Sequence, residues 1–221
     1  MKRVEGIKSI VFDMDGVIFD TERACIDAWK VVAEKHNISN IEDVCIACIG
    51  TNSNETRRIV LKNYGEDFPY DEYSLEMSSE FKKIFAKGIP VKKGAKELLS
   101  FLKENQVKMS IASSTKTATV IKELTEAGLV DYFDIIVGGD QVSRSKPNPD
   151  IFLAACEKLL AIPEKTYGIE DSFNGMRALK AAGMRPIMVP DIIKPDDEMK
   201  NIACTIREDL FKVIDYFNEE I

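Results

Sequence analysis

Two aspartates stand two residues apart at the end of a short apolar run. Asp13 and Asp15 follow residues 7–12, a stretch with β-branched side chains and no helical spacing, which is typical of a buried strand. On an extended backbone this spacing points both side chains to one face, where two carboxylates repel and raise each other's pKa unless a cation or proton intervenes. Gly16 lets the chain leave the strand with no side chain above the carboxylates. The pattern predicts a metal site; the alternative is a turn whose acids simply face water.

Further polar residues follow other predicted strands. Ser113 ends one apolar strand, Glu170 and Asp171 end another, and Lys146 lies in a loop that can return over the same edge. Ligands of open parallel sheets bind at the carboxyl ends of the strands, so we expect these groups to share one rim. Carboxylate and carbonyl oxygens suit Mg²⁺, and a lysine and a hydroxyl beside them suit a phosphoryl group. Taken singly, Ser113 and Asp171 could equally be helix caps, and Lys146 a solvated loop residue.

Histidine and cysteine usage narrows the possible mechanisms. His36 is the one histidine in the sequence and falls near the end of an amphipathic helix with no nucleophile motif beside it, so acid–base chemistry is expected to rest on carboxylates. The five cysteines are an odd number and predict no disulfide framework. Cys45 and Cys48 form a C-x-x-C within an apolar run and without a second pair, which favours buried side chains over a zinc or redox site.

Composition and charge restrict the class of protein. A chain of 221 residues with 45% hydrophobic and 30% charged residues fits one globular domain, or a core with a smaller insertion. The net charge of −7 argues against a nucleic-acid partner, because phosphate backbones require a basic surface. No apolar stretch approaches the roughly 20 residues that span a bilayer, and residues 1–6 show no secretory pattern. We therefore expect a cytoplasmic monomer that binds neither nucleic acid nor membrane.

The hydrophobic pattern predicts a helical insertion after the first strand, followed by strand–helix alternation. Helices of the insertion are expected at 22–35, 55–64 and 71–87. Beyond it, strands are expected at 107–112, 135–137, 166–169 and 186–189, and helices at 95–104, 116–127, 150–160, 173–182 and 207–219. Such alternation implies right-handed crossovers and an α/β fold with a doubly wound parallel sheet.

Four short motifs occur in order along the chain. They are Asp13-Met14-Asp15-Gly16-Val17, Ser113 after an apolar strand, Ser145-Lys146-Pro147, and Glu170-Asp171-Ser172. Together they resemble the four motifs of the haloacid dehalogenase-like hydrolase superfamily over nearly the whole chain, and most closely those of its β-phosphoglucomutase-like phosphatase branch. The resemblance implies a Rossmann-like core of residues 1–19 and 89–221, with a helical cap of residues 20–88 inserted after the first motif.

The resemblance also implies a role for each motif residue. Asp13 would be the nucleophile that attacks phosphorus and forms an aspartyl-phosphate. Asp15 would first protonate the leaving oxygen as general acid and then activate water as general base. Ser113 would donate a hydrogen bond to a phosphoryl oxygen, and Lys146 would neutralise charge on the nucleophile and the phosphate.

A Mg²⁺ site is implied by the same resemblance. Its ligands would be Asp13, the backbone carbonyl of Asp15, and Asp171, with Glu170 supporting the metal shell through water. The metal would offset the repulsion between a dianionic substrate and the attacking carboxylate. The expected partner is a small phosphorylated metabolite, such as a sugar phosphate.

Residues of the cap bear on the choice between hydrolysis and mutase chemistry. The sugar-phosphate mutases of this branch carry a cap histidine, a cap-loop arginine and a further cap lysine, which handle the sugar and a second phosphate. The matching positions here hold Cys25, Ser53 or Asn54, and Met77. These departures favour a phosphatase, with a hexose-phosphate mutase as the alternative.

Four residues are candidates for contact with the substrate, namely Cys25, Thr51, Asn52 and Ser114. A third hypothesis, from another class, is a non-catalytic acidic binding domain. The intact set of Asp13, Asp15, Lys146 and Asp171 argues against it.

Overall fold

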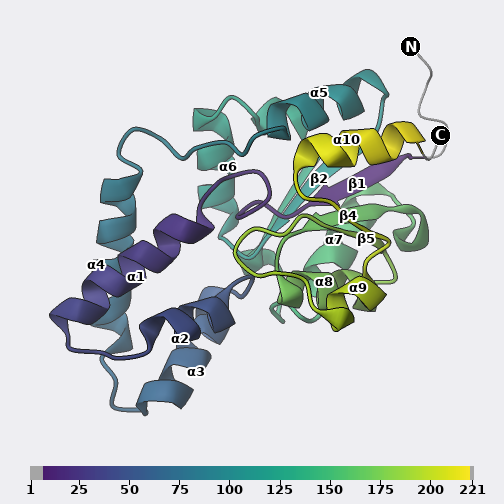
Figure 1. The fold of residues 1–221 in the computed structure, drawn as a ribbon. Coiled ribbons are helices and arrows are strands. Elements are labelled where there is room, and N and C mark those ends of the chain that lie inside the picture. The colour runs from purple at the N-terminus through teal and green to yellow at the C-terminus, as the bar shows by residue number, and fades with distance from the viewer. Residues whose placement is uncertain (1–6, 220–221) are drawn as a thin grey trace.

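A parallel β-sheet forms the centre of the structure, a computed structural model that describes residues 7–219 (Figure 1). Its six strands are β1 (Ser9–Phe12), β2 (Lys108–Ser113), β3 (Ile135–Gly138), β4 (Tyr167–Glu170), β5 (Arg185–Met188) and β6 (Thr205–Ile206). They are ordered β3-β2-β1-β4-β5-β6, and every neighbouring pair is parallel. Because β1 lies between β2 and β4, the carboxyl ends of the three strands that carry motifs are adjacent. The predicted α/β fold is confirmed.

Helices cover both faces of this sheet. One face carries α5 (Ala95–Glu104), α6 (Thr117–Glu126) and α10 (Leu210–Glu219), and the other carries α7 (Asp150–Leu159), α8 (Phe173–Ala181) and α9 (Asp197–Ile202). Successive residues of β1 alternate between the two apolar layers: Ile10 and Phe12 pack into the first and Val11 into the second. A strand buried on both faces explains the unbroken apolar run that precedes Asp13.

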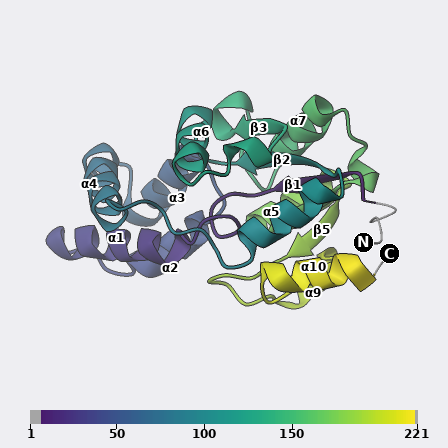
Figure 2. The same cartoon turned by 90° about the horizontal axis from the view of Figure 1, so that it is seen from above.

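Four helices inserted between β1 and α5 form a cap with its own core, set to one end of the sheet (Figures 1 and 2). They are α1 (Glu22–Lys35), α2 (Ile41–Cys48), α3 (Ser53–Tyr64) and α4 (Tyr70–Ile84). Their shared apolar cluster includes Trp29, Val32, Val44, Val60 and Tyr73. The helical insertion is confirmed, whereas the boundaries at 19/20 and 88/89 stay a prediction. Residues 1–6, 220 and 221 lie outside the described residues. They are part of the predicted core, and residues 1–6 are the segment in which the sequence shows no secretory pattern.

Some elements differ from the sequence prediction. The helix α2 has no counterpart in it, because its eight residues are too few for a periodic signal: two acids, Glu42 and Asp43, stand in its first turn, and the residues from Val44 to Cys48 are all apolar. The strand β6 has two residues and the helix α9 has six, too few for a periodic signal. Helix α4 ends at Ile84 rather than at residue 87.

His36 lies at the carboxyl end of α1, as predicted, and its Nε2 is 2.8 Å from Oε1 of Glu76 on α4. The histidine thus ties two cap helices together and does not line the cavity described below. Among residues 7–219, no helix combines the length and the apolar character that crossing a bilayer requires.

Candidate active site

Three buried carboxylates meet at the carboxyl ends of β1 and β4. Oxygens of Asp13, Glu170 and Asp171 lie within 4.8 Å of one another. The loop between β3 and α7 brings in Lys146, whose Nζ is 2.5 Å from Oδ1 of Asp13 and 2.6 Å from Oε1 of Glu170. Four residues from three distant segments therefore converge on the rim that the sequence predicts.

The charges of this cluster do not balance. When ionised, the three carboxylates and the one ammonium sum to −2. Burial works against the charged forms of Asp13, Asp171 and Lys146; at Lys146 the attraction of Asp13 and Glu170 outweighs burial and raises the pKa. At Asp13 burial outweighs Lys146 and raises the pKa to about 8, and burial with the charge of Glu170 raises the pKa of Asp171 well above its usual range. The cluster is short of positive charge, which a divalent cation would supply.

Glu170 is held more tightly than the other two acids. Its Oε2 accepts hydrogen bonds from the backbone N–H groups of Asp171 and Ser172, at 2.9 and 2.8 Å, and from Oγ of Ser172 at 2.9 Å. A Cβ at Gly175, in the first turn of α8, would lie 1.6 Å from the Glu170 carboxylate, so the helix can approach only with glycine there. The carboxylate of Asp171 accepts no hydrogen bond from the described residues. Glu170 is thus a fixed anchor, and Asp171 is open to a cation.

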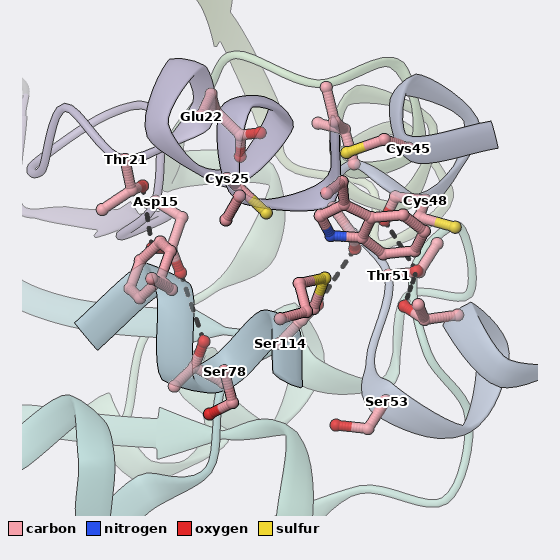
Figure 3. Close-up of a pocket in the computed structure, with 18 of the residues that line it drawn as sticks. Asp15, Thr21, Glu22, Cys25, Cys45, Cys48, Thr51, Ser53, Ser78 and Ser114 are labelled. Atoms are coloured by element: carbon pink, nitrogen blue, oxygen red, sulfur yellow. Dashed lines mark hydrogen bonds between the residues drawn. The ribbon is translucent and has the colours of Figure 1, made fainter. Parts of the chain in front are cut away.

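Asp15 points its carboxylate away from the cluster, toward two hydroxyls. Oγ1 of Thr21 donates to its Oδ1 at 3.0 Å and Oγ1 of Thr115 donates to its Oδ2 at 3.2 Å (Figure 3). Burial raises the pKa of Asp15, and the two hydroxyl donors oppose that shift. Directly after Asp15, Gly16 has φ +74°, and a Cβ there would lie 2.2 Å from Oδ2 of Asp171. The sequence predicted this need for glycine.

A cavity of about 450 Å³ opens between the rim and the cap. Asp13, Asp15, Asp171 and the segment that leads into α6, with Lys116, line its core side. Faces of α1, α2, α3 and α4 line its cap side. Figure 3 shows Glu22 and the thiols of Cys25, Cys45 and Cys48 along the wall formed by α1 and α2. A small molecule in this cavity would contact the acids with one end and the cap with the other.

Comparison with known proteins decides the family. The sequence matches the haloacid dehalogenase-like hydrolase family over residues 10–189. The chain belongs to this family. It is 33% identical to a phosphorylated carbohydrates phosphatase of Thermotoga maritima, over 82% of this chain and 84% of that protein, and 32% identical to the β-phosphoglucomutase of Bacillus subtilis, over 80% and 81%. The crystal structure of β-phosphoglucomutase from Clostridium difficile superimposes with a TM-score of 0.80 at 26% identity, covering 97% of this chain and 98% of that chain.

The remaining motif residue of this hydrolase, Ser113, is buried at the end of β2 and does not line the cavity. Its Oγ accepts the backbone N–H of Thr115 at 3.1 Å. A hydroxyl that accepts one hydrogen bond still has its own proton to donate. This hydrogen bond lies in the turn before α6 and does not cap the helix, which begins at Thr117 after the N-cap residue Lys116, so the capping alternative is wrong. The role toward a phosphoryl oxygen stays a prediction.

The four residues predicted to contact substrate fall into two groups. Cys25, Thr51 and Ser114 line the cavity. Asn52 is not among its lining residues, because its side chain caps α3 by accepting the backbone N–H of Glu55 at 3.0 Å. The side chain of Asn52, which was predicted to contact substrate, instead stabilises the start of α3 within the cap.

The loop between α2 and α3 joins the cap to two loops of the core and to the first turn of α8. Asn174 Nδ2 donates to the Ile49 carbonyl at 3.1 Å, Ser114 Oγ donates to the Gly50 carbonyl at 2.9 Å, and the Asn52 backbone N–H donates to Ser145 Oγ at 2.9 Å. These contacts set the position of the cap over the rim. Ser145 and Asn174 stand beside motif residues, but no sequence pattern indicates that they reach the cap.

Sequence reasoning missed Glu22, which lies in the first turn of α1 and lines the cavity. Its side chain is buried and accepts no hydrogen bond from the described residues. Burial and then the nearby charges of Cys25, Asp15 and Asp13 raise its pKa well above the usual range. An acid in the first turn of a helix ordinarily indicates interaction with the helix dipole, so the sequence held no signal for a place in the cavity.

Proposed function

We propose that the protein is a Mg²⁺-dependent phosphatase that hydrolyses a small phosphomonoester through an aspartyl-phosphate on Asp13. The observation that carries this proposal is the contact of Asp13 with Lys146, beside the open carboxylate of Asp171, in the lining of a cavity. A buried carboxylate held by an ammonium is placed to act as a nucleophile toward a phosphoryl group. Relatives named as phosphatases, such as the Thermotoga maritima protein, support the same reaction class.

The acids present suit Mg²⁺. Hard carboxylate oxygens are the ligands this ion prefers, and it binds with few protein ligands together with water and substrate phosphate. Asp13 and Asp171 would hold the ion, with the backbone carbonyl of Asp15 as a further ligand and Glu170 next to it. When bound, Mg²⁺ offsets the repulsion between the ester's oxygens and the carboxylates and polarises the phosphoryl oxygen.

The chain's own residues account for the rest of the reaction. Asp13 attacks phosphorus while Lys146 balances the charge that builds on the phosphoryl oxygens. Asp15, whose raised pKa favours the protonated form, gives its proton to the leaving alcohol and then accepts a proton from the attacking water. Because Thr21 and Thr115 fix the carboxylate of Asp15, the proton is delivered from a defined position.

Hydrolysis is better supported than mutase chemistry by the charge of the cap. A mutase must hold a second phosphate, and a buried phosphate without a cation partner is strongly unfavourable. Among the described residues that line the cavity, the cap contributes one charged side chain, the acid Glu22, and the one cation, Lys116, comes from the core at the start of α6. The nearby arginines are engaged elsewhere: Arg57 pairs with Asp71, and Arg58 pairs with Glu55.

Replacing the nucleophile tests the proposal. Asp13→Asn should lower the rate of phosphate release from small phosphomonoesters by about 10⁴-fold or more, the scale of losing a covalent nucleophile, without unfolding the protein. Asp197→Asn, at a fully exposed side chain of α9, is the matched control and should retain full activity. Activity of Asp13→Asn near that of the wild type would show that the nucleophile is another residue. Isomerisation that requires a bisphosphate activator would instead indicate a mutase.

A further inference from the structure

Three thiols from two cap helices line one wall of the cavity. Cys25 lies in α1, Cys45 and Cys48 lie in α2, and the two helices pack against each other. All three side chains line the cavity, and Figure 3 shows them along the same wall. Cys45 and Cys48 are buried, whereas Cys25 is partly exposed. A small molecule in the cavity can therefore reach the sulfur of Cys25 more easily than the other two sulfurs.

Two donors contact the sulfur of Cys25. The thiol of Cys45 donates a hydrogen bond to it, and so does the indole N–H of Trp29, one turn farther along α1. Together these donors outweigh burial and the charge of Asp15, so the pKa of Cys25 is lowered. The same hydrogen bond, together with burial, raises the pKa of Cys45. One sulfur of the pair is thus activated and the other keeps its proton, the asymmetry of dithiols that exchange with disulfides.

We propose that Cys25 and Cys45 form a reversible disulfide when a low-molecular-weight disulfide enters the cavity, and that this bond lowers the rate of turnover. Cys25 attacks one sulfur of the entering disulfide and forms a mixed disulfide; the other half leaves as a thiolate and takes up the proton that Cys25 has lost. The sulfur of Cys45 then attacks the sulfur of Cys25, and the second half leaves as a thiol with the proton of Cys45. Two protein thiols are oxidised, and one external disulfide is reduced to two thiols.

The position of Cys25 links this bond to the catalytic rim. Its backbone N–H donates to the Thr21 carbonyl at 2.9 Å, and the Thr21 hydroxyl donates to the carboxylate of Asp15 at 3.0 Å. A disulfide brings its sulfurs to about 2.05 Å, closer than two hydrogen-bonded thiols, so α1 and α2 are drawn together at this point. Because misplacing a catalytic group by about 1 Å costs up to about 100-fold in rate, turnover should fall. This effect on turnover rests on the proposed function, whereas formation of the disulfide does not.

Oxidation of the whole chain tests the proposal. After incubation with glutathione disulfide, peptide mapping under non-reducing conditions should find a bond between Cys25 and Cys45. The kcat/KM for a small phosphomonoester should fall by about tenfold or more and recover when a dithiol reductant is added. Free thiols at both positions would overturn the proposal, and a complete disulfide with full activity would overturn the effect on turnover. If the disulfide forms but neither form hydrolyses any ester, the phosphatase proposal falls and the disulfide stands.

Serine variants of the three cavity cysteines identify the partners. Cys45→Ser should stop at the mixed disulfide and keep glutathione on Cys25, whereas Cys25→Ser should give neither product in the cavity, because the raised pKa of Cys45 leaves little thiolate. Cys48→Ser is the matched control from the same helix and wall, and should form the bond as the wild type does. The exposed Cys204 should react in every variant and shows that the reagent is active. A bond kept in Cys45→Ser but lost in Cys48→Ser would overturn the assignment of Cys45.

Discussion

The two sides of the cavity differ in their charge and in the interactions that hold their side chains. On the core side, the carboxylates and Lys146 are buried and held by charge-assisted hydrogen bonds, such as those of Glu170 to Lys146 and to Ser172. On the cap side, the side chains are neutral apart from Glu22, and packing in the cap's own apolar cluster holds them. Charged groups buried in fixed geometry suit a reaction that moves charge, whereas neutral packing surfaces suit selection among alcohols.

The difference in charge assigns turnover to the core side of the cavity and the choice of substrate to the cap side. Changes on the core side alter the balance of buried charge, so they should affect both turnover and stability. Changes on the cap side alter contact area with the alcohol, so they should affect the choice of substrate at little cost to the chemistry. The largest effect is expected at Lys146, the one cation of the carboxylate cluster.

Removing the ammonium of Lys146 should have the largest effect. Lys146→Met leaves the buried carboxylates of Asp13 and Glu170 without their cation, and breaking a buried pair in this way costs about 3–5 kcal/mol of the free energy of unfolding. Lys200→Met removes an ion pair whose side chains are exposed, and should cost less than about 1 kcal/mol. Urea unfolding of both variants checks the comparison, together with phosphate release, which Lys146→Met should abolish. Equal stability of the two variants would mean that the buried pair contributes nothing.

Metal binding should have a smaller but clear effect on stability. If Mg²⁺ binds the folded cluster alone, it stabilises the protein by about 2.7 kcal/mol at a concentration one hundred times its Kd. Asp171→Asn removes the acid that is open to a cation and should lose most of the rise in melting temperature that Mg²⁺ produces in the wild type. Glu198→Gln, at an exposed acid of α9 paired with Arg177, should keep the whole rise. A rise of the same size in Asp171→Asn would place the metal elsewhere.

The core side could be predicted from sequence because its residues are charged, are energetically unfavourable in a buried position, and stand at strand ends. Asp13 and Asp171 follow short apolar strands, and parallel topology then brings strand ends to one edge. What the sequence could not give is the direction of each side chain. The spacing of Asp13 and Asp15 predicted paired carboxylates, but Asp15 turns to two threonines while Glu170 and Asp171 join Asp13.

The cap side was harder to predict because its residues are ordinary. The inner face of α4 has the pattern of an ordinary amphipathic helix, which does not indicate a cavity. The apolar run in α2 does not distinguish a helix from a strand. Asn52 has the polarity of a substrate contact, but a local cap hydrogen bond to Glu55 competes for the same side chain. Glu22 lines the cavity, but the sequence did not indicate this, because an acid in the first turn of a helix is common for reasons unrelated to a binding site.

The smallest predicted effect concerns Thr115, whose hydroxyl donates a hydrogen bond to the carboxylate of Asp15 on the core side of the cavity. Burial raises the pKa of Asp15, and this hydrogen bond to its charged form lowers it. Thr115→Val removes the donor, so the pKa should rise further, by about one unit if the hydrogen bond contributes about 1.4 kcal/mol. Because the protonated acid is needed to release the alcohol, activity is lost as pH rises through this pKa.

The alkaline limb of the pH profile of kcat/KM should therefore move to higher pH in Thr115→Val. Thr125→Val, on the exposed side of helix α6, which follows Thr115 in the chain, removes a hydroxyl that donates to the Ile121 carbonyl and should leave the limb in place. A limb that moves to lower pH would mean that Thr115 favours the protonated form of Asp15. An unmoved limb would mean that another group supplies the proton, and the division between the two sides of the cavity would need a different acid on its core side.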